Sequence, residues 1–184
     1  MKFSHDIQID GKRVCAVDDL LSMEHLQMLT QALHRSGYTR SEVARPDTAQ
    51  YRHWATEIDT KACQQMPIYS PAMQALSLFS PHTSLRLYRS YVNVAHFGDM
   101  LFTHTDCLPD AGEVTALWYI SEAWDPEWGG ETMFYDKNMD VRAAITPKPG
   151  RLALFDGDIP HAGRPPNRIC YAPRYTLAMK FERV

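Results

Sequence analysis

From residue 84 onward the sequence consists of short runs rich in β-branched and aromatic residues, each followed by a turn signal. Such side chains pack well on a pleated surface and favour strands, whereas the glycine, proline, asparagine and aspartate residues between them favour tight turns. Many short strands after a helical segment predict an α+β fold with a jelly-roll sandwich or barrel as its core. The predicted strands are Ser84–Phe97, Val114–Ile120, Glu131–Tyr135, Val141–Ile145, Arg151–Phe155 and Arg174–Phe181.

The preceding residues predict a hairpin and two helices that support this core. Residues 7–17 contain two strand-like runs around an Asp-Gly pair, which favours the positive φ angles of a two-residue turn. The first helix follows, capped by Asp18 or Asp19 and ended by Gly37 in a left-handed conformation. The second helix is Pro71–Phe79, with proline tolerated in its first turn.

The polar segment Ser41–His53 lies between the predicted helices and reads as a loop, because its Arg-Pro-Asp sequence disfavours regular structure. Functional lids are often loops of this kind, although a long polar loop can also be merely solvated. The candidate substrate contacts of this lid are Arg45, Arg52, His53 and the following Trp54.

The composition is typical of one globular domain, since 45% of the 184 residues are hydrophobic and 22% are charged. We expect a single domain, in which residues 1–84 form helical support and a lid and residues 85–184 form the core. A net charge of −3 with scattered lysines and arginines predicts no nucleic-acid partner. No apolar run approaches the ~18 residues of a membrane helix, so we expect no membrane partner and a cytoplasmic location. The four cysteines lack CxxC spacing, which favours reduced thiols over a zinc ribbon or disulfides.

Three residues form a candidate metal site. His104 and Asp106 are separated by one residue, so on an extended backbone their side chains point to the same side. His161 follows a predicted strand and a turn, and a rolled sheet can return it to them. Two imidazoles and one carboxylate on one face of a metal, with open positions opposite, suit non-haem Fe(II) oxygenases. Each part of this site has an alternative interpretation when it is taken alone. A His-x-Asp pair also occurs in solvated loops, and His161 could be a loop histidine that is hydrogen-bonded to the backbone.

Arg174 and Thr176 begin the last predicted strand and project to one face of it. An arginine followed by apolar residues is costly to bury unless it is paired, and its planar guanidinium binds carboxylates bidentately. Arg174 is therefore a candidate for the distal carboxylate of a 2-oxoglutarate co-substrate. The Thr176 hydroxyl is either a further donor to that carboxylate or a plain strand residue. Arg164 and Arg168, in a segment that reads as loop, are the alternatives to Arg174.

The stretch from Tyr88 to Phe181 resembles the catalytic domain of the prolyl 4-hydroxylase-like family of Fe(II)/2-oxoglutarate dioxygenases. The resemblance covers about half of the chain and rests on several motifs that occur in one order. An arginine at position 174 is typical of the branch distinct from animal collagen prolyl hydroxylases, which carry lysine there. The motifs are His104-Thr105-Asp106, Thr115–Ile120, Trp128–Thr132, Pro149–Arg151, His161 and Arg174-Tyr175-Thr176.

The resemblance implies a double-stranded β-helix, a jelly-roll or cupin-like core, that uses Fe(II), 2-oxoglutarate and O₂, with ascorbate as a supporting reductant. Its metal ligands would be His104, Asp106 and His161, and Arg174 would complete the catalytic set. Tyr119 matches a strand tyrosine that reaches the 2-oxoglutarate carboxylate in relatives. Tyr91 and Asn93 lie on the strand before the metal motif, which often contributes to co-substrate binding, although aromatic residues there are also common in cores. The implied cofactor contacts are thus Arg174, Thr176, Tyr119, Tyr91 and Asn93.

The implied reaction is hydroxylation of an unactivated C–H bond, in which 2-oxoglutarate yields succinate and CO₂. Asp106 argues against the halogenating relatives, which replace the carboxylate ligand by a small residue. The size of the chain favours a small molecule or an amino-acid-type substrate, with peptidyl proline as the alternative. Desaturation, epoxidation or cyclisation at the same site are further alternatives. A non-catalytic jelly-roll binding module and a Zn²⁺-dependent hydrolase or isomerase are the competing interpretations from other classes.

Overall fold

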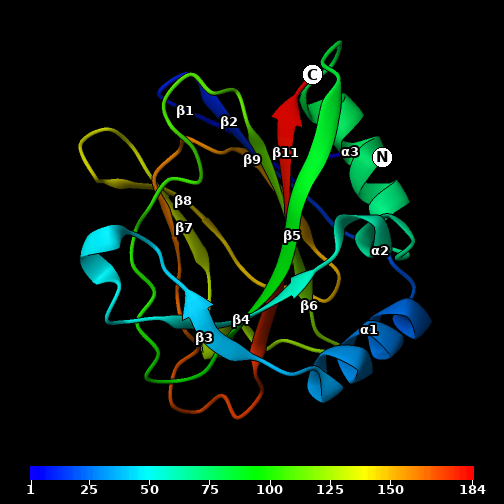
Figure 1. The fold of residues 1–184 in the computed structure, drawn as a ribbon, viewed down its shortest axis with the longest axis vertical. Helices are drawn as coiled ribbons and strands as arrows, with labels where there is room; N and C mark the ends of the chain where they lie inside the picture. Colours follow the sequence, from blue (N-terminus) through cyan, green and yellow to red (C-terminus); the bar gives the residue numbers. More distant parts are fainter.

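The computed structural model describes residues 1–184, and its largest element is an eight-stranded sheet (Figure 1). Every neighbouring pair in this sheet is antiparallel. The last strand of the chain lies in the middle of this sheet. Its two neighbours are the strands that precede and follow the His104-Thr105-Asp106 motif in the sequence. In sheet order the strands are β1 (His5–Ile9), β2 (Lys12–Val17), β9 (Leu152–Asp156), β6 (Val114–Ile120), β11 (Arg174–Arg183), β5 (Leu85–Ala95), β4 (His53–Ile58) and β3 (Thr39–Glu42).

A second, three-stranded sheet packs against the inner face of one half of the first. It contains β10 (His161–Gly163), β7 (Thr132–Tyr135) and β8 (Val141–Ile145), and β7 and β8 lie on the left of Figure 1. Buried apolar side chains from β2, β6 and β9 meet those of β7 and β8 between the sheets. This arrangement of two antiparallel sheets confirms the predicted double-stranded β-helix.

Three helices cover the outer face of the large sheet, on the right of Figure 1. They are α1 (Met23–Arg35), α2 (Thr60–Gln64) and α3 (Tyr69–Phe79), and two short 3₁₀ helices, η1 (Pro46–Thr48) and η2 (Pro126–Trp128), lie in loops. Apolar residues of the helices, such as Leu33 and Leu76, share one core with Trp118 and Leu177 of the sheet. No helix combines the length and the apolar character that crossing a membrane requires.

Alternation along β6 and β11 decides which side chains face the helices and which face the interior of the roll. Trp118 belongs to the core beneath the helices, whereas Leu117 and Tyr119 pack on the opposite face, as predicted. On β11 the residues Tyr175, Leu177, Met179 and Phe181 face the helices. The residues that alternate with them line the interior cavity, and they are Arg174, Thr176, Ala178 and Lys180.

The predicted ends of the first helix were wrong. Ser22 is its N-cap and accepts a hydrogen bond from the His25 amide at 3.2 Å. Asp18 instead forms an ion pair with Arg151, a buried residue whose guanidinium requires a partner. The helix ends at Ser36, and Gly37 does not adopt a positive φ. The hairpin turn agrees with the prediction, with positive φ at Asp10 and Gly11. The helix α3 ends at Phe79 as predicted but begins at Tyr69, two residues before the predicted Pro71.

The segment predicted as a polar lid contains more regular structure than its sequence suggests. It includes the end of β3, all of η1 and the start of β4, and both strands were missed because they are short and polar. Arg45 donates a hydrogen bond to the Thr103 carbonyl, which ties the segment to the metal motif. The first 84 residues thus supply β1 to β4 of the large sheet as well as the helices.

Candidate metal centre and co-substrate pocket

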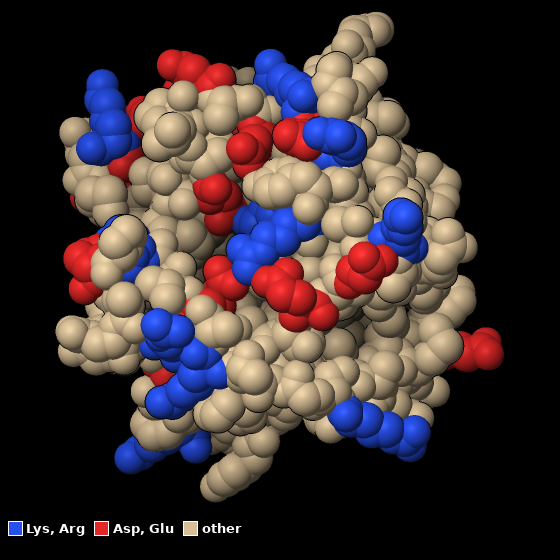
Figure 2. Space-filling model, in the orientation of Figure 1, with Lys and Arg blue, Asp and Glu red and all other residues tan.

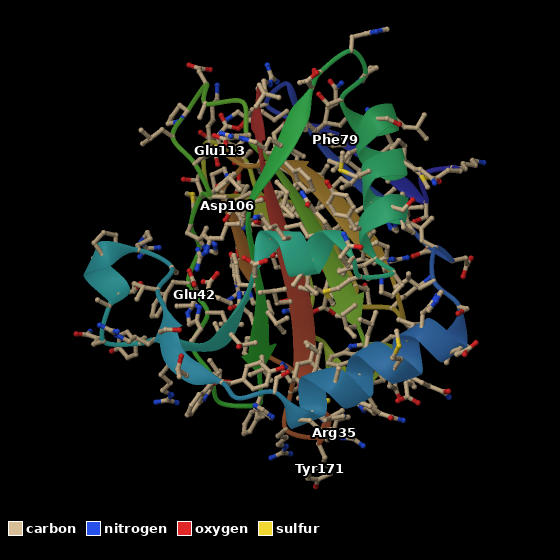
Figure 3. All side chains as sticks on the ribbon, turned by 45° about the vertical axis from the view of Figure 1, so that its right-hand side comes forward. Arg35, Glu42, Phe79, Asp106, Glu113 and Tyr171 are labelled. Atoms are coloured by element: carbon tan, nitrogen blue, oxygen red, sulfur yellow. The ribbon has the colours of Figure 1, made fainter.

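His104, Asp106 and His161 meet inside the roll, where one ligand atom from each lies within 4.8 Å of the others. His104 and Asp106 lie in the loop after β5, and His161 opens β10. The Nε2 atom of His104 is 3.5 Å from Asp106 Oδ1, and the Nε2 atom of His161 is 3.6 Å from Asp106 Oδ2. Side chains from two distant parts of the chain therefore converge on one point, where Asp106 is labelled in Figure 3.

Backbone hydrogen bonds fix the positions of the two histidines. The amide of each donates to the carbonyl of the other at 2.9 Å, so that His104 and His161 form an isolated β-bridge. Each imidazole Nδ1 also lies close to a carbonyl, that of Phe102 at 3.0 Å and that of Ile159 at 2.9 Å. A carbonyl can only accept, so Nδ1 carries the proton and Nε2 presents a lone pair to the cluster.

The electrostatics of the cluster favour metal ligation. Burial lowers the pKa of His161 to about 4, which keeps its imidazole neutral. Burial alone would raise the pKa of the Asp106 carboxyl, but the Lys180 ammonium holds it well below the ordinary value. Two imidazole nitrogens and one carboxylate oxygen are a donor set that suits a divalent transition metal. These three residues therefore fit the metal that the sequence predicts.

Arg174 is buried, with 4% of its surface exposed, yet no carboxylate of the chain pairs with it. Its Nε donates to the Gly130 carbonyl at 2.6 Å, and its Nη2 donates to Thr132 Oγ1 at 3.1 Å. The guanidinium also lies over the Tyr119 ring, 5.4 Å from the centroid. A Cβ at Gly163 would approach both terminal nitrogens to 3.4 Å, so this glycine leaves space at the end of the fork. A buried guanidinium with neutral partners and adjoining space fits a ligand carboxylate.

A single cavity joins Arg174 to the metal cluster. Thr176 and Lys180 on β11, Thr115 and Leu117 on β6, and Tyr91, Asn93 and Ala95 on β5 line its walls. The structure thus brings the predicted residues Thr176, Tyr91 and Asn93 to the same cavity as Arg174.

Three other predicted or alternative residues lie outside this cavity. Tyr119 lies one layer behind Arg174, where its hydroxyl donates to Thr132 Oγ1 at 2.6 Å. Its direct contact with the co-substrate stays a prediction. The alternatives Arg164 and Arg168 are exposed on the loop after β10, and neither lines the cavity.

Two polar residues of this site, Thr132 and Lys180, were not predicted as site residues, although Thr132 ends the Trp128–Thr132 motif. Thr132 is buried and supports both Arg174 and Tyr119. Lys180 is 6% exposed, and its ammonium contacts Asp106. The even spacing of Lys180 from Arg174 along one strand was a usable signal, since residues two apart share a face.

A second cavity of about 210 Å³ adjoins the metal cluster, and Arg174 does not line it. Of the five buried polar side-chain atoms without a hydrogen-bond partner, two belong to residues that line both this cavity and the cavity around Arg174, namely His53 Nε2 and Asn93 Oδ1. Burial lowers the pKa of His53, so its imidazole is neutral. The other polar residues of the cavity wall are Glu42, Tyr88, Arg89, Tyr91, His104, Thr105, Asp106 and Lys180.

Two glutamates flank Arg89 at the edge of this second cavity. Its Nη2 lies 2.6 Å from a Glu42 oxygen and 2.5 Å from a Glu57 oxygen, so the triad has a net charge of −1. Figure 2 shows basic groups bordered by acidic ones near the centre of this face, and Figure 3 shows Glu42 and Asp106 on the same side of the molecule. The charged residues that line the second cavity itself are two acidic and two basic ones, Glu42, Asp106, Arg89 and Lys180.

Comparisons with known proteins agree with this geometry. A sequence model of the 2OG-Fe(II) oxygenase superfamily matches residues 90–181, and no curated protein matches the chain. A Pseudomonas putida prolyl-4-hydroxylase is 22% identical, with a TM-score of 0.69 over 93% of this chain and 92% of that one. A Trichoplax adhaerens prolyl hydroxylase, solved with a hypoxia-inducible-factor peptide, is 20% identical, with a TM-score of 0.70 over 92% and 83%. HygX from Streptomyces hygroscopicus, solved with nickel and 2-oxoglutarate, is 13% identical, with a TM-score of 0.66 over 92% and 82%.

Proposed function

This chain belongs to the 2OG-Fe(II) oxygenase superfamily, and on that premise we propose that it hydroxylates an unactivated C–H bond of a small, polar or amino-acid-type molecule. In this proposal His104, Asp106 and His161 hold Fe(II). Arg174 binds the distal carboxylate of 2-oxoglutarate, with Thr176, Tyr91 and Asn93 lining the same cavity. When bound, the metal and co-substrate supply the oxidising power, and 2-oxoglutarate is converted with O₂ to succinate and CO₂.

The observation that carries the proposal is the unpaired Arg174 in the cavity that contains the metal cluster. An uncompensated buried charge is strongly unfavourable, and a non-catalytic binding module has no reason to combine such a guanidinium with three metal ligands in one cavity. A Zn²⁺-dependent hydrolase or isomerase on the same three ligands would likewise not need it. A dicarboxylate co-substrate accounts both for the buried positive charge of Arg174 and for its position in the cavity that contains the metal cluster.

The remaining residues of the pocket orient the ligands and exclude water. Thr132 and the Gly130 carbonyl hold the guanidinium fork in one direction, which suits bidentate recognition of a carboxylate. Phe155 packs edge-on against the His161 ring, with centroids 4.6 Å apart, and Phe134 lies behind both. Apolar walls of this kind keep bulk water from a reactive centre and strengthen the electrostatic interactions within it.

The second cavity supports a small, polar substrate. His53 and Asn93 provide buried polar atoms that no group of the protein satisfies, and such atoms are costly unless a ligand or water bonds to them. The Glu42–Arg89–Glu57 triad at its edge suits a substrate that carries charged groups, as amino acids do. Peptidyl proline is the alternative, favoured by the similarity to the two prolyl hydroxylase structures.

The co-substrate assignment is tested by anaerobic loading with Fe(II), followed by titration with 2-oxoglutarate under a visible spectrophotometer. We expect a weak charge-transfer band for the wild type and for Arg168→Gln, an exposed arginine outside the cavity. We expect no band for His161→Ala and a much higher half-saturation for Arg174→Gln. Absence of the band in folded, iron-loaded wild type would refute the proposal.

The substrate class is tested by 2-oxoglutarate-dependent succinate release in the presence of free amino acids or of proline-containing peptides. We expect one or more free amino acids to stimulate succinate release, and we expect at least tenfold less stimulation in His53→Leu. His25→Leu, on the polar face of α1, is the matched control and should behave as wild type. Stimulation by peptides alone would favour the prolyl hydroxylase alternative.

A further inference from the structure

We propose that Lys180 is a positioning residue that holds one oxygen of Asp106 and, as a fixed cation, weakens the binding of a divalent metal at the cluster. This inference rests on the proposed function only in taking Asp106 as a metal ligand. It predicts that removal of the Lys180 charge makes metal binding tighter, which is the opposite of what loss of a supporting residue would do.

Two side chains bond to one oxygen of the Asp106 carboxylate and also to each other. The Lys180 ammonium contacts Asp106 Oδ2 and donates to Thr115 Oγ1 at 3.1 Å. The Thr115 hydroxyl donates in turn to Asp106 Oδ2 at 2.6 Å. Lys180 and Thr115 lie opposite each other on β11 and β6, so the sheet register itself sets this arrangement. Oδ2 therefore accepts from two donors that are both fixed on central strands.

The other oxygen of Asp106 remains available. No side-chain or backbone donor bonds to Oδ1, and the nearest ligand atom is His104 Nε2 at 3.5 Å. With Oδ2 occupied and the carboxylate plane fixed, Asp106 can offer a metal only Oδ1. Ligation through one oxygen leaves a coordination position that a second oxygen would otherwise occupy, and open positions are what a site of this type requires.

Burial explains why Lys180 matters for metal affinity. The side chains of Lys180 and Asp106 are 8% and 6% exposed, and Asp106 is the one carboxylate that the ammonium contacts. Without metal the pair is charge-balanced, as a buried ion pair must be. A metal at Oδ1 adds two positive charges beside the ammonium, and charges repel strongly where little water screens them. The metal and Lys180 thus compete for one carboxylate.

The test is a titration with Mn(II) alone, without 2-oxoglutarate, in which free Mn(II) is measured by electron paramagnetic resonance. We expect the Mn(II) dissociation constant of Lys180→Met to fall by roughly tenfold or more. Lys180→Arg keeps the charge and should stay within about threefold of wild type. Lys12→Met removes a lysine that pairs with Asp158 near the surface, and should leave the constant unchanged. An unchanged or higher constant in Lys180→Met overturns the inference.

A second variant and a second measurement distinguish an effect on metal binding from a general loss of folding stability. Lys180→Gln keeps a hydrogen-bond donor, the side-chain amide, for Asp106 Oδ2 but removes the charge. Its Mn(II) dissociation constant should also fall. The melting temperature of the metal-free protein should decrease in both neutral variants, since Asp106 loses its counter-ion, while saturating Mn(II) restores most of the loss. An equal decrease with and without Mn(II) would show a purely structural role and contradict the inference.

A His161→Ala variant separates this inference from the proposed function. If that variant binds Mn(II) as wild type does, the cluster is not the metal site and the proposed function fails as well. If it loses Mn(II) binding while Lys180→Met binds with the wild-type constant, the metal site stands and the role of Lys180 alone is refuted.

Discussion

The two deeply buried arginines, Arg151 and Arg174, have opposite surroundings. Arg151, next to β9 and 2% exposed, forms two hydrogen bonds to the Asp18 carboxylate, at 2.6 and 2.8 Å. Arg174, at the start of β11 and 4% exposed, contacts a carbonyl and a threonine hydroxyl but no carboxylate. Burial alone therefore does not indicate function.

The difference lies in where the counter-charge comes from. Arg151 is satisfied within the fold, where it ties the segment after β2 to the sheet. Arg174 lies in a cavity, and its counter-charge must come from a ligand. A buried cation that the chain leaves unpaired is a stronger indication of a binding site than a buried cation as such. The following predictions test this distinction, beginning with the largest effect.

Asp18→Asn should lower the free energy of unfolding by about 3 kcal/mol, because it leaves Arg151 buried without a counter-ion. Urea denaturation measures the loss, and the dissociation constant for 2-oxoglutarate should not change. A loss below about 1 kcal/mol would mean that water satisfies Arg151, and the contrast with Arg174 would then disappear.

The same pair should make stability depend on pH in acid. Hydrogen bonding to Arg151 lowers the pKa of Asp18 below its ordinary value of 3.8. The folded state therefore binds this proton less readily than the unfolded state, so the stabilisation is present above pH ~4 and is lost as the pH falls through the folded pKa. Denaturation curves of wild type and Asp18→Asn should converge at low pH. Parallel curves down to pH ~2 would contradict this account.

Arg174→Gln should raise the dissociation constant for 2-oxoglutarate at least a hundredfold, equivalent to about 2.7 kcal/mol. Its free energy of unfolding should stay within about 1 kcal/mol of wild type, since an unpaired buried charge is replaced by a neutral amide. Calorimetric titration and urea denaturation give the two values. A loss of stability as large as that of Asp18→Asn would make Arg174 a structural residue like Arg151.

Thr132→Val should weaken 2-oxoglutarate binding by about tenfold, because Arg174 loses one of the two groups that orient it. The matched control is Thr30→Val on α1, a buried threonine whose hydroxyl has no partner. This control should leave co-substrate affinity unchanged and should not lower stability. Equal affinities for Thr132→Val and wild type would show that the guanidinium needs no support from Thr132.

Local sequence patterns predicted much of the fold and the central part of the site. The strands Val114–Ile120 and Val141–Ile145 have the predicted bounds, and alternation placed Trp118 opposite Tyr119. The one-residue spacing of His104 and Asp106 placed both on one side of the backbone. These features depend on the pleat and on turn chemistry, which neighbouring residues determine.

Other features depend on contacts between distant segments and were decided only in the tertiary structure. Ser22 rather than Asp18 caps α1 because Arg151, far along the chain, binds Asp18. The short strands β3, β4 and β10 exist because longer strands and the metal motif offer them backbone partners. Lys180 meets Asp106 only because β11 lies beside β6. A sequence fixes which face of a strand carries a charge, but the partner of a buried charge depends on which strands become neighbours.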